Sequence, residues 1–380
     1  MYLDNNATTM VAPEVLEAML PFFKDSYGNP SSIHRFGGMV RRSVERAREQ
    51  VADLLGVSAE EILFTSCGTE SNNTALKGFF HKHRSNTKIY TSAVEHPAVR
   101  NTARYLKEQG ATLHEVGVDK QGMISTQFWD QNFGSDTLVS LMWANNETGV
   151  IFPVEQIAQK VKSSGGVFHT DAVQAVGKVP LDLSDSAIDL LSLSGHKVHA
   201  PKGVGALFVR KGISIPPFLH GGHQEYGMRA GTENVPYIVA LGKACELAKA
   251  HIEDENTRVR ALRDRLESEL LAKCKGAKLN GDKDSRLPNT TNISFEAIEG
   301  EAILLLLDEY GIAASSGSAC TTGSLEPSHV MMAMGIPYTF AHSSTRFSIS
   351  RYTTSEEVDT VIKVMPPIVE KLRSLSPFVE

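Results

Sequence analysis

The chain contains little cysteine, no long apolar run and no strong excess of either charge. Its four cysteines, Cys67, Cys245, Cys274 and Cys320, lie far apart and form no CxxC pair, so neither a zinc site nor a disulfide framework is indicated. No stretch of about eighteen apolar residues occurs, and we therefore expect no membrane-spanning helix. A formal charge of −6 over 380 residues does not suggest a nucleic-acid partner.

The first residues, MYLDNNATT, also lack the basic and apolar regions of a signal peptide. We therefore expect a protein of the reducing cytoplasm. We predict no metal site. The histidines His196 and His199 are three positions apart, but Pro201 argues against a helix that would bring them together.

What is present is the pattern of a sheet covered by helices. Helical spacing of apolar residues occurs first, over residues 14–24 and 39–55, and Gly56 supplies a helix stop. From about residue 60 to 210, short apolar runs alternate with amphipathic helices, which is typical of a mostly parallel sheet with helices on both faces. The predicted strands are 61–66, 88–93, 138–144, 166–171, 188–194 and 205–211, and the predicted helices are 70–83, 97–109 and 154–164.

The last third of the chain predicts a smaller α+β domain. A long polar helix over 254–274 is followed by strand 292–298, helix 301–311, strand 345–350 and a last helix from about 355. Thr354 and Glu357 have the spacing of a capping box at the start of that helix. We predict an α/β protein in two parts: a large domain over 15–250, and a small domain made of 1–14 and 251–380.

Polar residues follow five of the predicted strands at the point where each strand ends. In open α/β sheets, ligands bind beyond the carboxyl ends of the strands. Any one cluster could be a surface turn, but five together predict a site in one crevice. The clusters are Cys67-Gly68-Thr69-Glu70, Glu95-His96, Asn145-Asn146-Glu147, His169-Thr170-Asp171 with Gln174, and Ser194-Gly195-His196-Lys197.

A lysine directly after an apolar strand is either a solvated turn residue or an amine that condenses with an aldehyde cofactor. Lys197 has this position. Gly195 allows a close backbone approach to a ligand, and Ser194 and His196 carry groups that can donate hydrogen bonds to a phosphate.

Two further clusters fit the same kind of ligand. Gly68 and Thr69 open a predicted helix, whose free N–H groups suit an anion, although an ordinary N-cap threonine is an equal alternative. Asp171 ends an apolar strand, which suits a carboxylate that meets a cation, although it could cap the following helical turn. Gln174 faces the same side if a helical turn intervenes.

The chain resembles the cysteine desulfurases, in the class V aminotransferase group of pyridoxal-phosphate enzymes of fold-type I. The motifs that carry the resemblance are SLSGHK, HTDAVQ, VEHPAV, NNETG, RAGTEN and SSGSAC, and they extend over nearly the whole chain. The segment SSGSACTTGSLEPSHV is similar to the NifS/IscS branch rather than the SufS branch, and TTGSLEPSHVMMAMGIP and the last helix resemble NifS most. Gly68 stands where many relatives have alanine.

The resemblance implies a pyridoxal phosphate cofactor and a function for each matching residue. Lys197 binds the cofactor and moves the α-proton, Cys320 takes the sulfur, and His96 stacks on the ring. Asp171 pairs with the ring nitrogen and Gln174 with the ring hydroxyl. The implied phosphate ligands are Gly68, Thr69, Ser194 and His196, with Thr232 acting across the interface of a homodimer. Asn146 contacts the cofactor and, with Arg346, binds the substrate.

The activity implied is conversion of L-cysteine to L-alanine, with the sulfur held as a persulfide on Cys320 for an Fe–S scaffold protein, as in nitrogenase-linked NifS. Cys245 and Cys274 fall in helical patterns and are expected to be inert, whereas Cys67 has no implied function. Two alternatives stay open. One is another class V enzyme, either an aminotransferase, which needs no reactive thiol, or a selenocysteine lyase. The other is a non-catalytic Fe–S assembly partner that keeps the fold.

Overall fold

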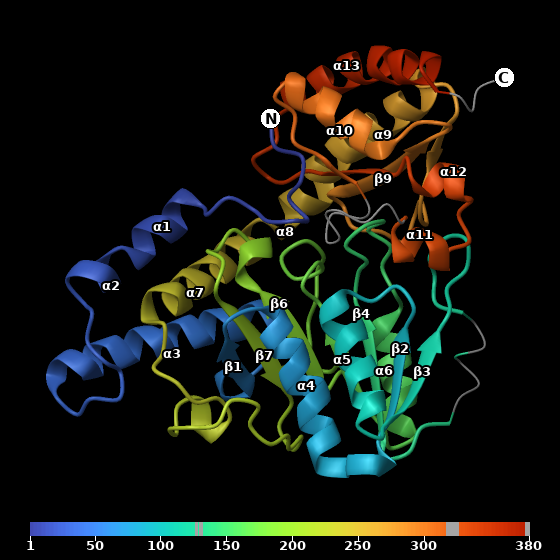
Figure 1. Cartoon of the computed structure of the whole chain (residues 1–380). Helices are drawn as coiled ribbons and strands as arrows, with labels where there is room; N and C mark the ends of the chain where they lie inside the picture. Colours follow the sequence, from blue (N-terminus) through green and yellow to red (C-terminus); the bar gives the residue numbers. More distant parts are fainter. Residues whose placement is uncertain (126–127, 129–131, 317–326, 377–380) are drawn as a thin grey trace.

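A seven-stranded sheet forms the centre of the larger part of the molecule (Figure 1). The computed structural model describes residues 1–125, 128, 132–316 and 327–376. The spatial order of the strands is β1-β7-β6-β5-β4-β2-β3. Their bounds are β1 Ile62–Thr65, β2 Lys88–Ser92, β3 Thr112–Val116, β4 Thr137–Met142, β5 Val167–Asp171, β6 Leu190–Ser194 and β7 Gly205–Val209. The prediction located six of these strands and missed β3.

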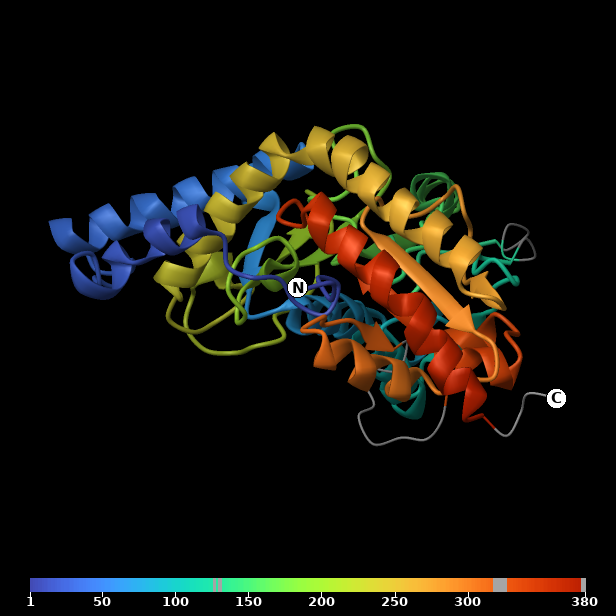
Figure 2. The ribbon, with the colours of Figure 1, turned by 90° about the horizontal axis from the view of Figure 1, so that it is seen from above.

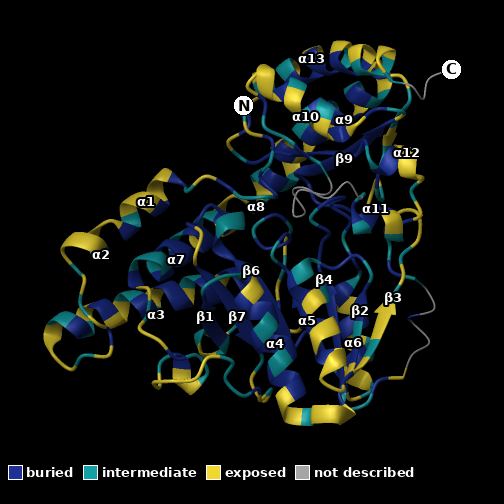
Figure 3. Ribbon diagram, in the orientation of Figure 1, coloured by how far each residue is buried: buried dark blue, intermediate teal, exposed yellow. Residues whose placement is uncertain are grey.

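The sheet is mostly parallel, as predicted. Strands β3, β2, β4, β5 and β6 run parallel, whereas β7 pairs antiparallel with both β6 and β1. Neighbouring residues along a strand point to opposite faces: Leu63 and Leu190 pack with one apolar cluster, and Phe64 and Leu191 with another. The strands are therefore buried on both sides, which Figure 3 shows as a dark blue centre.

Helices cover both faces of this sheet. Helices α4 (Gly68–His83) and α5 (Pro97–Glu108) contribute to the apolar cluster on one face. Helices α3 (Arg35–Leu55), α6 (Val154–Ser163) and α7 (Val235–Ala250) contribute to the cluster on the other face. These helices do not cover the carboxyl ends of the parallel strands. Those ends lie at the edge of the sheet that faces the smaller part of the molecule (Figure 1).

The predicted helix 14–24 is wrong as a single element. The structure has two short helices, α1 (Pro13–Met19) and α2 (Pro21–Lys24), with a break at Leu20. Proline has no backbone N–H and cannot continue the helical hydrogen-bond ladder, so Pro21 starts a new helix instead. Figure 2 shows α1 and α3, in blue, extending away from the sheet.

A four-stranded sheet with the order β10-β11-β9-β8 forms the second part. Its strands are β8 Ala277–Leu279, β9 Thr290–Phe295, β10 Ser315–Ser316 and β11 Thr345–Ser348. Its helices are α9 Arg260–Lys273, α10 Gly300–Glu309, α11 His329–Ala333, α12 Tyr338–Ala341 and α13 Ser355–Ser374. The first residues join this part, because Leu3 lies in its apolar core and Asp4 forms a bridge to Ser348.

Two details of this second part bear on the predictions. The capping box at Thr354 and Glu357 is confirmed, with each side chain bonded to the backbone N–H of the other residue. The long helix expected over 254–274 is interrupted, because α8 (Ile252–Asp254) leads into a π-helical turn over Glu255–Val259 before α9 begins. Among the described helices, none is long and apolar enough to cross a membrane.

Candidate active site

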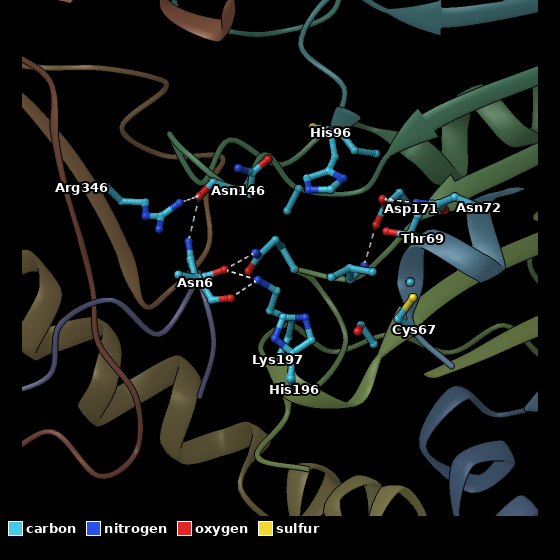
Figure 4. A pocket seen from close by; sticks show the side chains of 17 residues that line it. Asn6, Cys67, Thr69, Asn72, His96, Asn146, Asp171, His196, Lys197 and Arg346 are labelled. Carbon is cyan, nitrogen blue, oxygen red and sulfur yellow. Dashed lines mark hydrogen bonds between the residues drawn. The ribbon is translucent and has the colours of Figure 1, made fainter. Parts of the chain in front are cut away.

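A pocket of about 290 Å³ lies where the carboxyl ends of the parallel strands meet the second sheet (Figure 4). It brings together ten of the twelve residues predicted from the sequence. These are Gly68, Thr69, His96, Asn146, Asp171, Gln174, Ser194, His196, Lys197 and Arg346. The convergence follows from the topology, because residues after neighbouring parallel strands emerge at the same edge of the sheet.

Lys197 enters the pocket from a 3₁₀ turn over Gly195–Lys197, directly after β6. Its Nζ donates hydrogen bonds to the backbone carbonyls of Asn6, at 2.5 Å, and Ala7, at 2.7 Å. A Cβ on Gly195 would come within 2.9 Å of Val204, so the turn needs glycine to pack closely. The N-terminal segment therefore fixes where this amine lies.

Asp171 ends β5, and two donors hold its carboxylate. Oδ2 accepts a hydrogen bond from Nδ2 of Asn72 at 2.7 Å, and Oδ1 accepts one from the backbone N–H of Val173 at 3.0 Å. Asn72 lies on α4, three residues after Thr69 and therefore on the same side of the helix. These two donors fix the position of the carboxylate, whose oxygens suit a partner with positive charge.

The N-terminus of α4 and the end of β6 form a cradle that fits an anion. Ser194 Oγ is buried and has no hydrogen-bond partner among the described residues, and such an orphaned donor is uncommon unless a ligand completes it. Gly68 opens the 16-residue helix α4 at this point, where free backbone N–H groups attract phosphate. A Cβ at Gly68 would lie 2.8 Å from Val173 Cγ2 and 3.4 Å from Ser194 Cβ, so this close packing suits glycine.

His196 adds to the same cradle. Burial, together with the positive charges of Lys197 and Lys202, lowers the pKa of its imidazole to about 4. Its Nδ1 lies 3.2 Å from the Thr8 hydroxyl. The ring is therefore neutral at pH 7 and lies in surroundings rich in positive charge, which an anionic ligand would complement.

His96 is the N-cap residue of α5, and its Nδ1 accepts a hydrogen bond from the backbone N–H of Ala98 at 3.1 Å. This bond leaves Nε2 as the protonated nitrogen of the neutral ring. Burial lowers the pKa of His96, and the negative charge of Asp171 opposes that shift. The ring lies on the pocket wall (Figure 4), where its flat face can pack on a planar ligand.

Gln174 is held by contacts on both ends of its amide. Nε2 donates to the backbone carbonyl of Asn6 at 2.9 Å, and Oε1 accepts from Nζ of the buried Lys178 at 2.7 Å. The sequence pointed to Gln174 but not to Lys178. The lysine lies four residues further along the chain, in the same run of turns, and this spacing was the available signal.

The opposite wall comes from the second sheet. Arg346, on β11, donates from Nη1 to the Asn146 carbonyl at 2.8 Å and from Nη2 to Asp4 Oδ1 at 2.6 Å. Its Nε is buried and without a hydrogen-bond partner among the described residues. The guanidinium is thus anchored at the pocket on both Nη1 and Nη2, and its planar, charged set of donors makes a carboxylate its natural ligand.

The remaining two predicted residues lie elsewhere. Thr232 is exposed and lines a separate hollow of about 160 Å³ with Arg229 and Glu233, away from the pocket. Cys320 lies outside the described residues. Asn6, Ala7 and Asn72 also line the pocket, although no site function was predicted for them.

Comparisons with known proteins agree with this geometry. The model of the family described as aminotransferase class-V matches residues 1–361. A cysteine desulfurase of Trichormus azollae is 57% identical over 379 residues, covering 100% of this chain and 95% of that protein. The cysteine desulfurase NifS of Azotobacter vinelandii is 56% identical over 380 residues, with 100% and 94% covered. A solved structure titled as a NifS-like protein superimposes with a TM-score of 0.91 at 40% identity, covering 98% of this chain and 100% of that one.

Proposed function

Because this chain belongs to the class-V aminotransferase family, we propose that it is a pyridoxal-phosphate-dependent cysteine desulfurase. The observation that carries the proposal is the convergence of three groups in one pocket. These are an amine after β6 (Lys197), a firmly held carboxylate at the end of β5 (Asp171) and an orphaned hydroxyl beside the N-terminus of α4 (Ser194).

The described residues fit pyridoxal phosphate. Ser194, Thr69, His196 and the N-terminus of α4 would hold the phosphate, with the free hydroxyl of Ser194 as the clearest vacant donor. Asp171 would meet the ring nitrogen and His96 would pack on the ring. When bound, the cofactor supplies an aldehyde for amines and a ring that accepts electrons from the substrate α-carbon.

The protein's own groups would bind the substrate and move its protons. Arg346, with its unpaired Nε, and Asn146 would hold the carboxylate of L-cysteine. The Lys197 amine, kept in place by the Asn6 and Ala7 carbonyls, would take the proton from the substrate α-carbon and donate a proton again later in the reaction. Asn72 and Val173, which donate to Asp171, would hold its carboxylate in place.

Sulfur transfer is assigned to Cys320. Its thiolate would attack the sulfur of the bound cysteine, and the bond between that sulfur and the substrate β-carbon would break. The products are alanine and a persulfide on Cys320, so the atoms of one L-cysteine are accounted for. The acceptor that fits this chemistry is an Fe–S scaffold protein in the cytoplasm, and the 56% identity to NifS favours a nitrogenase-linked setting.

We propose the same two domains as above, 15–250 and 1–14 with 251–380. Leu3 packs with the core of the second sheet and Val15 with that of the first, which supports the division, whereas Ala12 packs with the first core and falls on the other side of it.

The test of function is a pair of cysteine variants. Purified protein with L-cysteine and a reductant should form sulfide and alanine in equal amounts, and mass spectrometry should find a persulfide on the peptide with Cys320. Cys320→Ala should keep the visible absorbance of bound cofactor but lose nearly all sulfide release. Cys67→Ser is the matched control, because Cys67 lines the pocket without an assigned function. Full activity of Cys320→Ala, together with loss of activity in Cys67→Ser, would show that Cys67 is the residue that accepts the sulfur.

The proposed homodimer has its own test. Thr232 lies outside the pocket of its own chain, so it can serve the phosphate only in a partner subunit. Mixing inactive Thr232→Ala and Lys197→Ala proteins under conditions of subunit exchange should restore part of the activity, since one site of each mixed dimer is then intact. No recovery in a mixture shown to contain mixed dimers would contradict the shared site.

A further inference from the structure

A second lysine, Lys178, lies buried beside the pocket, and the chemistry proposed above does not use it. Its side chain is 5% exposed. Nζ donates to Gln174 Oε1 at 2.7 Å and to Asn6 Oδ1 at 3.4 Å. A buried lysine is costly unless its ammonium is paired or hydrogen-bonded, so its retention next to a ligand site calls for an explanation.

The contacts of Gln174 settle which way its amide faces. An ammonium group only donates, so the atom 2.7 Å from Lys178 must be the amide oxygen. A backbone carbonyl only accepts, so the atom 2.9 Å from the Asn6 carbonyl must be the amide nitrogen. A flipped amide would place its nitrogen against the Lys178 ammonium, donor against donor, and its oxygen against the Asn6 carbonyl, acceptor against acceptor. The nitrogen has two N–H groups, and Asn6 takes one of them, which leaves the other for a ligand in the pocket.

The charges around Lys178 are mixed. Burial lowers the pKa of its ammonium to about 7, the positive charges of Lys197 and Arg346 act in the same direction, and the negative charge of Glu255 opposes them. Glu255 lies in the π-helical turn, is 5% exposed and lines the same small cavity as Lys178. The nitrogen donates to Gln174 whether or not it carries the extra proton, so the contact survives this titration.

We propose that Lys178 is a positioning residue that locks the Gln174 amide with its nitrogen toward the pocket, as a donor to the ring oxygen of the cofactor. This rests on the proposed function, since it needs a ligand with such an oxygen. The contact through Oε1 anchors the far end of the amide, and the contact with Asn6 anchors the near end. Without Lys178, the amide keeps one anchor and can turn away from the ligand.

The readout is the pH titration of the visible absorbance of the protein–cofactor complex, which needs no substrate. A hydrogen bond donated to the ring oxygen stabilises the negatively charged form of that oxygen. The chromophore therefore loses its proton at a lower pH, which lowers the midpoint of the titration. Lys178→Met, which keeps the length but removes the donor, should raise the midpoint by about one pH unit and weaken cofactor binding about tenfold. Lys178→Gln, which restores a neutral donor, should recover most of both changes.

A double-mutant cycle separates positioning from a general effect of charge. Gln174→Ala should raise the midpoint as Lys178→Met does, and Lys178→Met or Lys178→Gln made in the Gln174→Ala background should change it no further. An unchanged midpoint in Lys178→Met would overturn the proposal. So would equal shifts in Lys178→Met and Lys178→Gln, or full additivity with Gln174→Ala.

The outcome also separates this inference from the proposed function. Wild-type protein that gains no visible band with pyridoxal phosphate refutes the function. If the wild type titrates normally and Lys178→Met has the same titration midpoint, only the function proposed for Lys178 is refuted. Circular dichroism checks that each variant is folded. Lys178→Gln and the double-mutant arm keep the test open if Lys178→Met does not fold.

Discussion

The two walls of the pocket are built in different ways. One wall consists of residues at the ends of strands in the seven-stranded sheet, including His96, Asp171 and Lys197. Neighbouring parallel strands, paired side by side, support this wall. The other joins residues from opposite ends of the chain, because Asp4 and Asn6 bond to Arg346 and Ser348, each pair 342 residues apart. The first wall holds the groups proposed for chemistry, and the second those proposed for binding and orientation.

This difference has a functional meaning. The strand-end wall is rigid, since its sheet is buried on both faces by helices, and catalytic groups work best when held in one geometry. The second wall depends on contacts between segments from opposite ends of the chain, so we expect its residues to be changed with less loss of the chemical step. We therefore expect variants of the first wall to lower kcat and variants of the second to raise KM.

The largest effect is expected at Lys197. Lys197→Ala should lower cysteine turnover by at least about 10³-fold, because the group proposed to bind the cofactor covalently and to move the proton is lost. Lys202→Ala, an exposed lysine five residues along, is the control and should keep near-normal activity. Borohydride reduction of wild-type protein with peptide mapping should find the pyridoxyl group on Lys197, and finding it on Lys202 would reverse the assignment.

Asp171→Asn should have the next largest effect. The substitution keeps the shape and at least one contact with Asn72 or Val173, but it removes the negative charge opposite the ring nitrogen. We expect kcat to fall about 10²-fold while cofactor still binds. Asn72→Ala is the graded comparison, with a loss nearer tenfold, because it removes one donor to the carboxylate and leaves its charge. Equal losses in the two variants would argue that the charge itself does little.

Arg346→Gln tests the second wall. Loss of a charged hydrogen-bond donor to the substrate carboxylate costs about 1.5–3 kcal/mol, which corresponds to a rise in KM of roughly 10- to 150-fold. The change in kcat should be smaller. Asp4→Asn is the matched control, since it removes the ion pair with Arg346 but leaves the guanidinium. A similar rise in KM in Asp4→Asn would mean that Arg346 acts mainly by tying the N-terminal segment to β11.

The last effect is on stability rather than activity and concerns Glu95, next to His96. Burial raises the pKa of its carboxyl to about 8. The folded protein then holds a proton that the unfolded chain releases near pH 4.5, so Glu95 costs stability increasingly as the pH rises from about 5 to 8. Over this range, the free energy of unfolding of Glu95→Gln should rise relative to that of the wild type by up to about 1.4 kcal/mol per pH unit, as measured by urea unfolding. The exposed Glu108→Gln is the control, and a Glu95→Gln difference that does not change with pH would contradict the expectation.

The same contrast explains what could be read from the sequence. Lys197, Asp171 and His96 were found because each lies at the end of an apolar strand or a few residues after it, and parallel strands bring their ends together. Asn6 could not be found in this way, since no local pattern signals that residue 6 contacts residue 197 or 348. Pro21 is a case where a local signal was present and overlooked, because helical spacing of apolar residues hid the break that proline makes.

The pairing of the N-terminal segment with β11 sets the order in which this protein can mature. A ribosome adds about 5–20 residues per second, so the partner of Asp4 emerges roughly 17–70 s after Asp4 itself. The seven-stranded sheet is complete once residue 209 is made, and it can fold while the first residues still wait. The nascent chain can therefore form the strand-end wall well before β11 is available to complete the other wall of the pocket.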